Sequence, residues 1–557
     1  MKNKKTNFLL TIILLVSFLI RIYKIDNLSL FGDEIDVGYQ AYSLLKTQHD
    51  YRGYFLPFYT ESLSESRAPL LIYSTIPSVA IFGLNEIGVR LPVIIFSILS
   101  IYFLYKLVLL VSESNTLALL SAMALSLTPW HYFYSRAAFE VTLLTTLILA
   151  ATYYFYTYIK KDKIFFLYLS VVLFGLSFYT YNTANIFIPL LVLYLLFSSN
   201  FLKKQLNLKN LFLVITLTLV LISPMIKEIL WGKATERFSS LNIFNNQNIV
   251  DQIIIKRTSF SSLNNQTIER LFHNKLINFS NTFLKNYFQS ISPSFLFFNE
   301  NQINPRHSIS SNGLLFITFF ILLIHGLFNF DKKNKYHRLF AYWLIISPIP
   351  AAMTLNGGTH PTRLFLMVVP LSFFIALSIS KILKSKYYLI IITTIVVALV
   401  LEISIFSHEY FVHYPKDNPT IWNYGYKQLF TDLSKLNYNR LFISNSKYNS
   451  LLPYLFYNQV VPTSINLDDH EKQNIVENIP GFKISPSIFF LNNWRQNNEI
   501  FQKIDNFSAL NDVFVLFQLN EIPGEMDFSK DSLKGYKTIK TIYNPDKTIL
   551  GQVIQKI

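Results

Sequence analysis

The sequence predicts a polytopic, all-α membrane protein that carries a C-terminal soluble α/β domain. Hydrophobic residues make up 51% of the 557 residues and charged residues only 15%, whereas an average soluble domain carries about 25% charge. About eleven apolar segments approach the roughly 20 residues that a membrane-crossing helix needs. After residue 406 the chain returns to a soluble character with short strand-like runs.

The charge and cysteine content exclude several classes of protein. The formal net charge is +16, but the Lys and Arg residues form short clusters between apolar runs, which is typical of anchoring at the inner membrane leaflet rather than of nucleic-acid binding. Cysteine is absent, so disulfides and thiolate chemistry are excluded. The chain also contains no Gly-rich phosphate loop, zinc motif or nucleophile elbow.

The amino terminus predicts a retained signal anchor. A basic start, residues 1–5, precedes the apolar run 8–20, and no small-x-small cleavage site follows. We therefore expect a cytoplasmic amino terminus.

The apolar segments predict the topology. They lie near residues 7–25, 90–111, 116–133, 139–159, 164–181, 183–199, 210–226, 311–330, 337–353, 363–380 and 387–406. The run 70–82 is short and contains Pro77. If it does not cross, the basic clusters near residues 160, 204, 333 and 384 all fall on the cytoplasmic side, so we interpret it as an interfacial or re-entrant helix. Residues 26–89 and 227–310 then form outer loops, and residues 407–557 lie outside the cell membrane.

Three carboxylates, Asp33, Glu34 and Asp36, follow the first span within the outer loop 26–89. Apolar residues at helical spacing predict an amphipathic helix over 34–46. One interpretation makes Asp33 an N-cap with Asp36 as its partner. The other is an acid-base site, in which Asp33 is the base and Glu34 orients it. The three carboxylates could also hold a divalent cation.

Other polar residues are predicted on the same outer face. Arg136 and Glu140 are four residues apart, which fits a helix-supporting ion pair or an anion site built on the guanidinium. Arg306 and His307 precede a span and could contact a lipid headgroup. His360 and Arg363 lie in a helix-breaking loop. The Phe-rich run 292–298 is expected to anchor the chain at the interface.

The tail predicts a small α/β domain. Strands are expected at 440–444, 487–491 and 513–518, helices at 421–436 and 450–457, and a hairpin from 536–543 and 548–554. The Asn544-Pro545-Asp546-Lys547 stretch supplies the turn of this hairpin.

Several short motifs follow one another in a familiar order: Phe31-Gly32-Asp33-Glu34, Ala68-Pro69, Val89-Arg90-Leu91-Pro92, 135–140 (SRAAFE) and 360–363 (HPTR). This order resembles the polytopic glycosyltransferases of the GT-C fold, in particular bacterial members of the dolichyl-phosphate-mannose protein mannosyltransferase and aminoarabinose transferase group. The resemblance covers residues 7–406 and defines residues 1–406 as the transmembrane glycosyltransferase domain.

The resemblance implies transfer of a sugar from a polyprenyl-phosphate donor to a glycan, lipid or protein acceptor outside the membrane. By that resemblance Asp33 and Glu34 lie at the reaction centre. The donor phosphate would be bound by Arg136, Arg67, His360 and Arg363. Glu140 stands where protein mannosyltransferases usually have Asp, which leaves the acceptor open.

The chemistry of such a donor needs no acid, because lipid phosphate is already a good leaving group and cations can stabilise its developing charge. A single displacement would invert the anomeric centre. Two alternatives remain from the sequence: a transporter, whose ionisable groups usually lie within the spans, and an adaptor that captures a partner through residues 407–557.

Overall fold

The computed structural model describes most of the chain, in two compact units. The described residues are 2–62, 66–199, 201, 207–231, 241–244, 247–259, 270–298, 304–309, 313–445, 450–462, 474–476, 479–492, 508–517 and 535–557. Parts of the predicted outer loop 227–310 and the last residue of the predicted strand 513–518 lie outside this set. Unit 1 comprises Met1–Tyr23, Ser62–Leu71 and Leu91–Tyr410, and unit 2 comprises Lys24–Glu61, Ile72–Arg90 and Phe411–Ile557.

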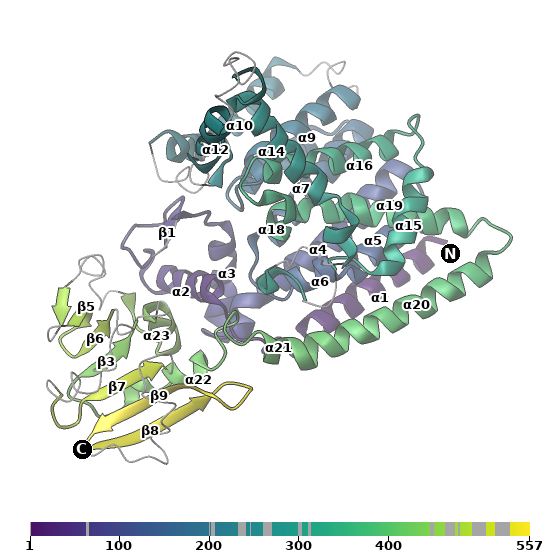
Figure 1. Cartoon of the computed structure of the whole chain (residues 1–557). Coiled ribbons are helices and arrows are strands. Elements are labelled where there is room, and N and C mark those ends of the chain that lie inside the picture. The colour runs from purple at the N-terminus through teal and green to yellow at the C-terminus, as the bar shows by residue number, and fades with distance from the viewer. Residues whose placement is uncertain are drawn as a thin grey trace. The chain divides into compact units, whose positions relative to one another are not determined.

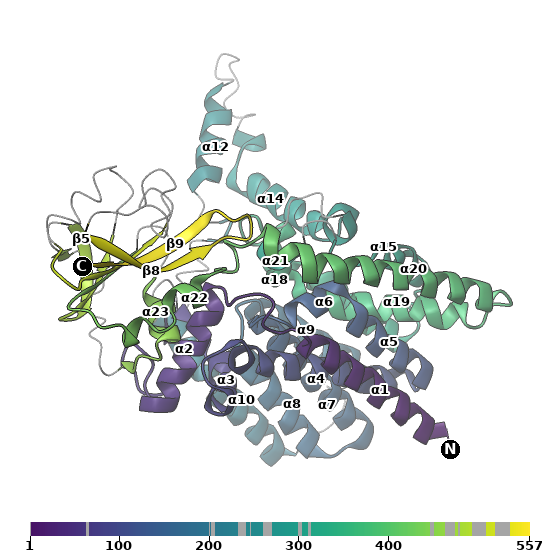
Figure 2. The same ribbon diagram turned by 90° about the horizontal axis from the view of Figure 1, so that it is seen from below.

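Unit 1 is helical. Its longer helices are α1 (Lys2–Ile22), α4 (Glu86–Ser112, which starts in unit 2), α5 (Asn115–Leu127), α7 (Glu140–Lys161), α8 (Ile164–Ser177), α9 (Ala184–Ser198), α10 (Leu208–Trp231), α12 (Gln247–Ser259), α14 (Lys275–Ser290), α15 (Ile317–Phe328), α16 (Lys335–Ile346), α19 (Val368–Ile382) and α20 (Tyr388–His408). Short helices connect them: α6 (Pro129–Tyr134), η2 (Ser294–Phe298), η3 (Pro305–His307), α17 (Ile349–Ala352), η4 (Gly357–Thr359), α18 (Pro361–Leu364) and η5 (Phe365–Met367). Helices α7 and α8 pack against each other and lie side by side in Figure 2.

The central helix of unit 1 is α19. Together with the short helices before it, α19 forms the apolar stretch Pro361–Ile382. In the most apolar 18-residue segment of this stretch, 89% is buried. Helix α19 packs against α5, α15 and α16. By contrast, only 11% of the corresponding segment in Tyr388–Asp417 is buried, so α20 presents most of its apolar surface outward, as expected for a lipid-facing helix.

Each of the eleven predicted segments contains a helix, but several of these helices are shorter than predicted, and two segments are divided at a proline. The segment 116–133 divides into α5 and α6, because Pro129 starts a new helix after the extended Thr128. The segment 337–353 divides into α16 and α17, with Pro348 at the break.

The number of crossings stays a prediction. Within the described part of the chain, six helices are long and apolar enough to cross a membrane, and five shorter apolar helices accompany them. The run predicted as interfacial, α3 (Leu70–Phe82), is one of the shorter five.

Unit 2 joins part of the first predicted outer loop to the C-terminal region. Helix α2 (Gly32–Thr47) contains the predicted helix 34–46 and packs against α23 (Leu451–Tyr457). The Tyr39 hydroxyl donates to the Val460 carbonyl at 2.9 Å. A Cβ on Gly38 would lie 2.7 Å from side-chain atoms of Phe456 and Val89, so glycine is what allows this close approach.

Unit 2 also contains a mixed seven-stranded sheet (Figure 1). Its strand order is β4-β5-β6-β3-β7-β9-β8, in which β3 pairs in parallel with β6 and β7 and the outer pairs are antiparallel. The strands are β3 (Leu441–Ser444), β4 (Asn474–Val476), β5 (Ile479–Ser485), β6 (Ile488–Leu491), β7 (Val513–Phe517), β8 (Tyr536–Tyr543) and β9 (Ile549–Lys556). Two-residue strands β1 (Thr60–Glu61) and β2 (Ser66–Arg67) lie before α3.

The predicted α/β tail is confirmed, with two differences. Strands β4 and β5 were not predicted, and the predicted helix 421–436 is broken into α22 (Tyr426–Phe430) and η7 (Leu433–Lys435). The break follows from the backbone, because Gly425 and Asp432 adopt left-handed conformations with φ of 78° and 65°. Such residues end a helix.

The contact between α15 and α19 predicts a requirement for glycine at position 326. A Cβ there would overlap the carbonyl oxygen of Phe374 on α19, and backbone cannot yield as a side chain can. We expect Gly326→Ala to destabilise the protein by about 1–3 kcal/mol through overpacking, measured as thermal unfolding in detergent. Gly32→Ala is the matched control, since a Cβ on Gly32 meets nothing within 4 Å; equal stability of the two variants would refute the close contact.

Candidate active site

The carboxylate of Glu34 forms a buried ion pair with Arg90 in unit 2. Arg90 Nε lies 2.7 Å from Glu34 Oε1 and Nη2 lies 2.6 Å from Oε2. Both side chains are almost fully buried, with exposed fractions of 1% and 0%. A two-pronged arginine-carboxylate pair fixes orientation as well as distance, so Glu34 locks the first turn of α2 to the start of α4.

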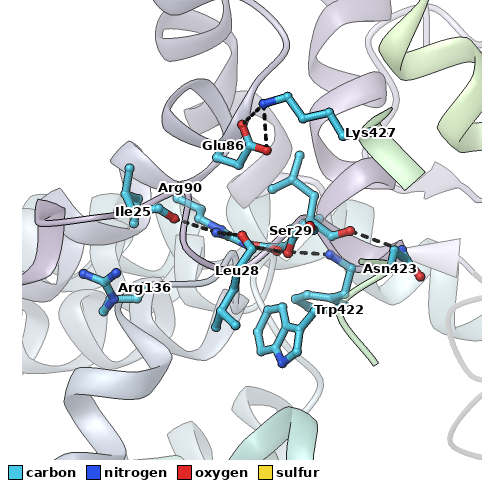
Figure 3. Close-up of polar contacts among 12 residues, drawn as sticks. Ile25, Leu28, Ser29, Glu86, Arg90, Arg136, Trp422, Asn423 and Lys427 are labelled. Atoms are coloured by element: carbon cyan, nitrogen blue, oxygen red, sulfur yellow. Dashed lines mark hydrogen bonds and ion pairs between the residues drawn. The ribbon is translucent and has the colours of Figure 1, made fainter. Parts of the chain in front are cut away.

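Arg90 also fixes the chain segment that enters α2. Its Nη1 donates to the carbonyls of Ile25 and Leu28, both at 2.7 Å, and its Nη2 donates to Ser29 at 2.9 Å. Figure 3 shows the guanidinium among these groups. The Arg90 guanidinium therefore donates hydrogen bonds to three backbone carbonyls and one carboxylate. These bonds hold residues 25–29 in one backbone conformation.

Two residues of the C-terminal region, Trp422 and Asn423, add to the contacts that Arg90 makes with Glu34 and residues 25–29. We call this set of contacts the clasp. The Asn423 side chain donates to the Leu30 carbonyl at 3.1 Å. The Trp422 ring meets the Phe31 ring edge-on at 5.4 Å and lies 5.9 Å from the Arg90 guanidinium. Residues 25–31 are thus held from both sides within unit 2 (Figure 3).

The three acidic residues of this region have three different environments. Glu34 pairs with Arg90, and Asp36 is buried and accepts a bond from the Tyr51 hydroxyl at 2.9 Å. Asp33 is partly exposed in the first turn of α2. Asp33 is therefore the acidic residue of the three that solvent and a substrate can reach.

The structure contradicts two interpretations from the sequence. The N-cap of α2 is Phe31 rather than Asp33, and the Phe31 N–H donates to Glu34 Oε2 at 3.3 Å. The three carboxylates also do not form a cation site, because among the described residues no group of three or more His, Asp or Glu side chains could hold a metal ion.

In unit 1, Arg136 caps the end of α1. It lies in the turn between α6 and α7, where its Nη1 donates to the carbonyls of Ile20, Arg21 and Tyr23 at 3.2, 2.6 and 2.7 Å. Its Nε donates to the Tyr410 hydroxyl at 3.1 Å. Carbonyls at a helix C-terminus lack partners within the helix and attract a cation. This geometry gives Arg136 a structural function, and its predicted contact with phosphate stays a prediction.

The predicted ion pair between Arg136 and Glu140 on one helix face does not match the fold. Helix α7 begins at Glu140, so Arg136 lies outside it. Glu140 instead lies 3.5 Å from Arg67, and both side chains are largely buried. Two predicted site residues from distant parts of the sequence are therefore brought together.

Further predicted residues of unit 1 lie in a polar cluster formed by Tyr134, His307, His360 and Thr362. The Tyr134 hydroxyl lies 3.1 Å from His307 Nδ1 and 2.8 Å from Thr362 Oγ1. The rings of His307 and His360 are 5.1 Å apart between centroids. Phe139, the residue before Glu140, packs against the cluster, with its ring centroid 5.7 Å from that of His307.

Two arginines lie next to this polar cluster in the sequence. Arg306 precedes His307, and Arg363 follows Thr362. Arg363 Nη1 donates to Thr354 Oγ1 at 2.7 Å and to the Leu355 carbonyl at 3.2 Å. Both arginines and both histidines are partly exposed.

The predicted site residues divide between the units. Asp33 and Glu34 belong to unit 2, and the remaining ones belong to unit 1: Arg67, Arg136, Glu140, Arg306, His307, His360 and Arg363. Sequence reasoning assigned no role to Arg90 or Trp422. An arginine inside an otherwise apolar helix was the available signal for Arg90, because such a charge is costly without a partner.

The chain has the GT-C fold, which a solved structure shares. ArnT from Cupriavidus metallidurans, in a crystal structure bound to undecaprenyl phosphate, matches with a TM-score of 0.51 and 10% sequence identity, over 99% of this chain and 98% of that chain. The predicted fold class is thereby confirmed.

A family model supports the same group. Residues 66–227 match the model described as dolichyl-phosphate-mannose-protein mannosyltransferase.

The archaeal oligosaccharyltransferase AglB from Archaeoglobus fulgidus, in complex with an inhibitory peptide and a dolichol-phosphate, is a weaker match, with a TM-score of 0.47 and 14% identity over 82% of this chain. The chain spans only 64% of AglB. No curated protein matches the chain. The expected resemblance to the mannosyltransferase and ArnT group is confirmed.

The buried ion pair predicts a large effect of removing Arg90. Arg90→Met would leave the Glu34 carboxylate buried without its cation, which typically costs about 3–5 kcal/mol. The double variant R90M/E34Q should recover part of this loss, because no charge then stays buried. Lys160→Met is the control, since its ion pair with Glu113 is equally short at 2.6 Å but more than half exposed, and such pairs contribute about 0–1 kcal/mol. Chemical denaturation in detergent measures all three, and a loss no larger than that of Lys160→Met would contradict the clasp.

Proposed function

We propose that this protein is a membrane glycosyltransferase that transfers a sugar from a polyprenyl-phosphate donor to an acceptor hydroxyl outside the membrane. The single observation that carries the proposal is the presentation of Asp33: a partly exposed carboxylate on a helix turn that a buried ion pair fixes. A general base needs both properties, access to the substrate and a defined position. The GT-C fold and the family match over residues 66–227 support the same class.

Asp33 is the proposed base. In a single displacement it accepts the proton of the acceptor hydroxyl while the acceptor oxygen attacks the anomeric carbon, and the bond from that carbon to the phosphate oxygen breaks. The leaving polyprenyl phosphate keeps the bonding electrons, and the anomeric configuration is inverted. Glu34 acts as a positioning residue through Arg90, because its oxygens already accept bonds from the guanidinium and the backbone.

The donor phosphate is proposed to bind the arginines and histidines around the polar cluster of unit 1. Arg363, Arg306, His307 and His360 are partly exposed there, and guanidinium groups suit phosphate through charge-assisted hydrogen bonds. Arg67 and Arg136 are more deeply buried, which favours a supporting function for them. The developing negative charge on the phosphate is what these groups would stabilise.

Replacing Asp33 tests the reaction directly. We expect Asp33→Asn to lower sugar transfer about 10²–10⁴-fold, since it removes a general base, without changing thermal stability. The assay uses purified protein in liposomes with radiolabelled undecaprenyl-phosphate sugars and a cell-envelope extract as acceptor. Asp162→Asn is the control, because Asp162 is exposed at the end of α7 in a left-handed conformation that Asn also adopts. The transferase proposal fails if none of the radiolabelled sugar donors is consumed. It also fails if the parent protein transports a solute across the liposome membrane and Asp33→Asn transports that solute equally well.

Replacing Arg363 tests donor binding. Loss of one charge-assisted hydrogen bond of about 1.5–3 kcal/mol should weaken the binding of undecaprenyl phosphate by about tenfold or more in Arg363→Met. Lys384→Met, which removes an exposed cation after α19, is the matched control. Binding is measured by tryptophan fluorescence or native mass spectrometry, and equal affinities of the two variants would remove Arg363 from the phosphate site.

A further inference from the structure

Unit 2 contains a cavity of about 630 Å³ that the proposed chemistry does not use. Its walls come from three parts of the chain: Asp26 and Ser29 before α2, Glu86 at the start of α4, and the C-terminal region around α22 and β8. The volume falls within the roughly 300–1,000 Å³ of small-molecule sites. It is large enough for a ligand of several rings.

The two cations of this cavity are already engaged by the protein. Lys427 Nζ lies 3.0 and 2.9 Å from the two oxygens of Glu86 (Figure 3). Lys540 Nζ donates to the carbonyls of Gln428 and Thr431 at 2.7 and 3.1 Å, and burial lowers the pKa of Lys540. Neither ammonium group is therefore well placed to attract an anion.

The remaining polar groups of the cavity are mostly acceptors and neutral groups. Asp26 and Asp432 supply carboxylates, and one oxygen of Asp432 already pairs with Lys435 at 2.6 Å. Ser29, Gln428 and Thr431 supply hydroxyl and amide groups. A carboxylate accepts hydrogen bonds only, whereas hydroxyls and amides both donate and accept. Ile542 is the one aliphatic side chain in the lining.

This lining excludes several kinds of ligand. A divalent cation does not fit, because the described residues contain no group of three or more acidic or histidine side chains that could hold one. An anion would have to displace Glu86 from Lys427 or Asp432 from Lys435, and an apolar peptide would leave the acceptors unpaired. A neutral ligand rich in hydroxyl groups matches the lining, because each hydroxyl can donate to a carboxylate and accept from an amide.

The cavity adjoins the segment that leads to Asp33. Ser29 lines the cavity, and its carbonyl accepts a bond from Arg90 in the clasp. Asp33 follows four residues later, at the start of α2. A ligand in the cavity is thus held by the same unit that presents the proposed base.

We propose that this cavity binds a glycan, a neutral polyhydroxylated ligand that forms part of the sugar acceptor. This assignment rests on the proposed function and narrows its acceptor from glycan, lipid or protein to an acceptor that carries sugar residues. The carboxylate of Asp432 accepts hydrogen bonds from the glycan hydroxyls, and Gln428 supplies a complementary amide.

The experiment measures binding separately from catalysis. Saturation-transfer difference NMR is recorded on the full-length protein in detergent, with a mixture of neutral oligosaccharides and, in a second sample, of uronic-acid oligosaccharides. Asp432→Asn removes the charge but suits the left-handed backbone at this position, and Gln428→Trp fills the cavity from an exposed position without removing a charge. Asp546→Asn, at the exposed turn between β8 and β9, is the matched control.

We expect neutral oligosaccharides to give signals that Asp546→Asn retains, that Asp432→Asn weakens about tenfold in affinity, and that Gln428→Trp abolishes. Asp33→Asn should keep these signals while losing sugar transfer. The inference is overturned if neutral oligosaccharides give no signal, if only the uronic-acid samples bind, or if the cavity variants bind like the control. In each of those cases donor consumption by the parent protein would still support the transferase, so the two proposals fail separately.

Discussion

The ion pair between Arg90 and Glu34 is the interaction on which the proposed catalytic segment depends. A buried charge is tolerable only when its partner and its remaining hydrogen bonds are supplied, and here a single guanidinium satisfies a carboxylate and three backbone carbonyls. The energetic demand of burying Arg90 therefore orders residues 25–29. That order places Asp33 at the surface of α2 in a defined position.

Arginine has a comparable function in the other unit. Arg136 gathers the carbonyl groups at the end of α1, as Arg90 gathers those of residues 25–29. In an apolar protein, such arginines donate the hydrogen bonds that water would otherwise donate to the unpaired carbonyl groups at helix ends. The most deeply buried arginines therefore organise the backbone, and the partly exposed Arg363 and His360 are the residues for which we propose contact with a substrate.

The sequence predicted the fold well and the site only in part. Apolar length located a helix in each of the eleven predicted segments, since burial in lipid imposes that pattern locally. It did not locate α12 and α14, which lie in the predicted outer loop 227–310. Local signals could not show that Glu140 would contact Arg67 or that Glu34 would be occupied by Arg90, because these pairs join residues 73 and 56 positions apart. The sequence also could not show the breaks at Gly425 and Asp432, which depend on left-handed backbone conformations. The role of Asp33 as base is still a prediction from the sequence, now supported by its exposure.

The single-turnover rate of sugar transfer by Arg90→Lys, with the donor already bound, tests the central claim most directly. Lysine keeps the positive charge but lacks the planar fork that satisfies several acceptors at once. If the clasp positions Asp33, this variant will bind undecaprenyl-phosphate sugar as the parent protein does and will transfer the sugar much more slowly. An unchanged transfer rate in a folded Arg90→Lys protein would contradict the account.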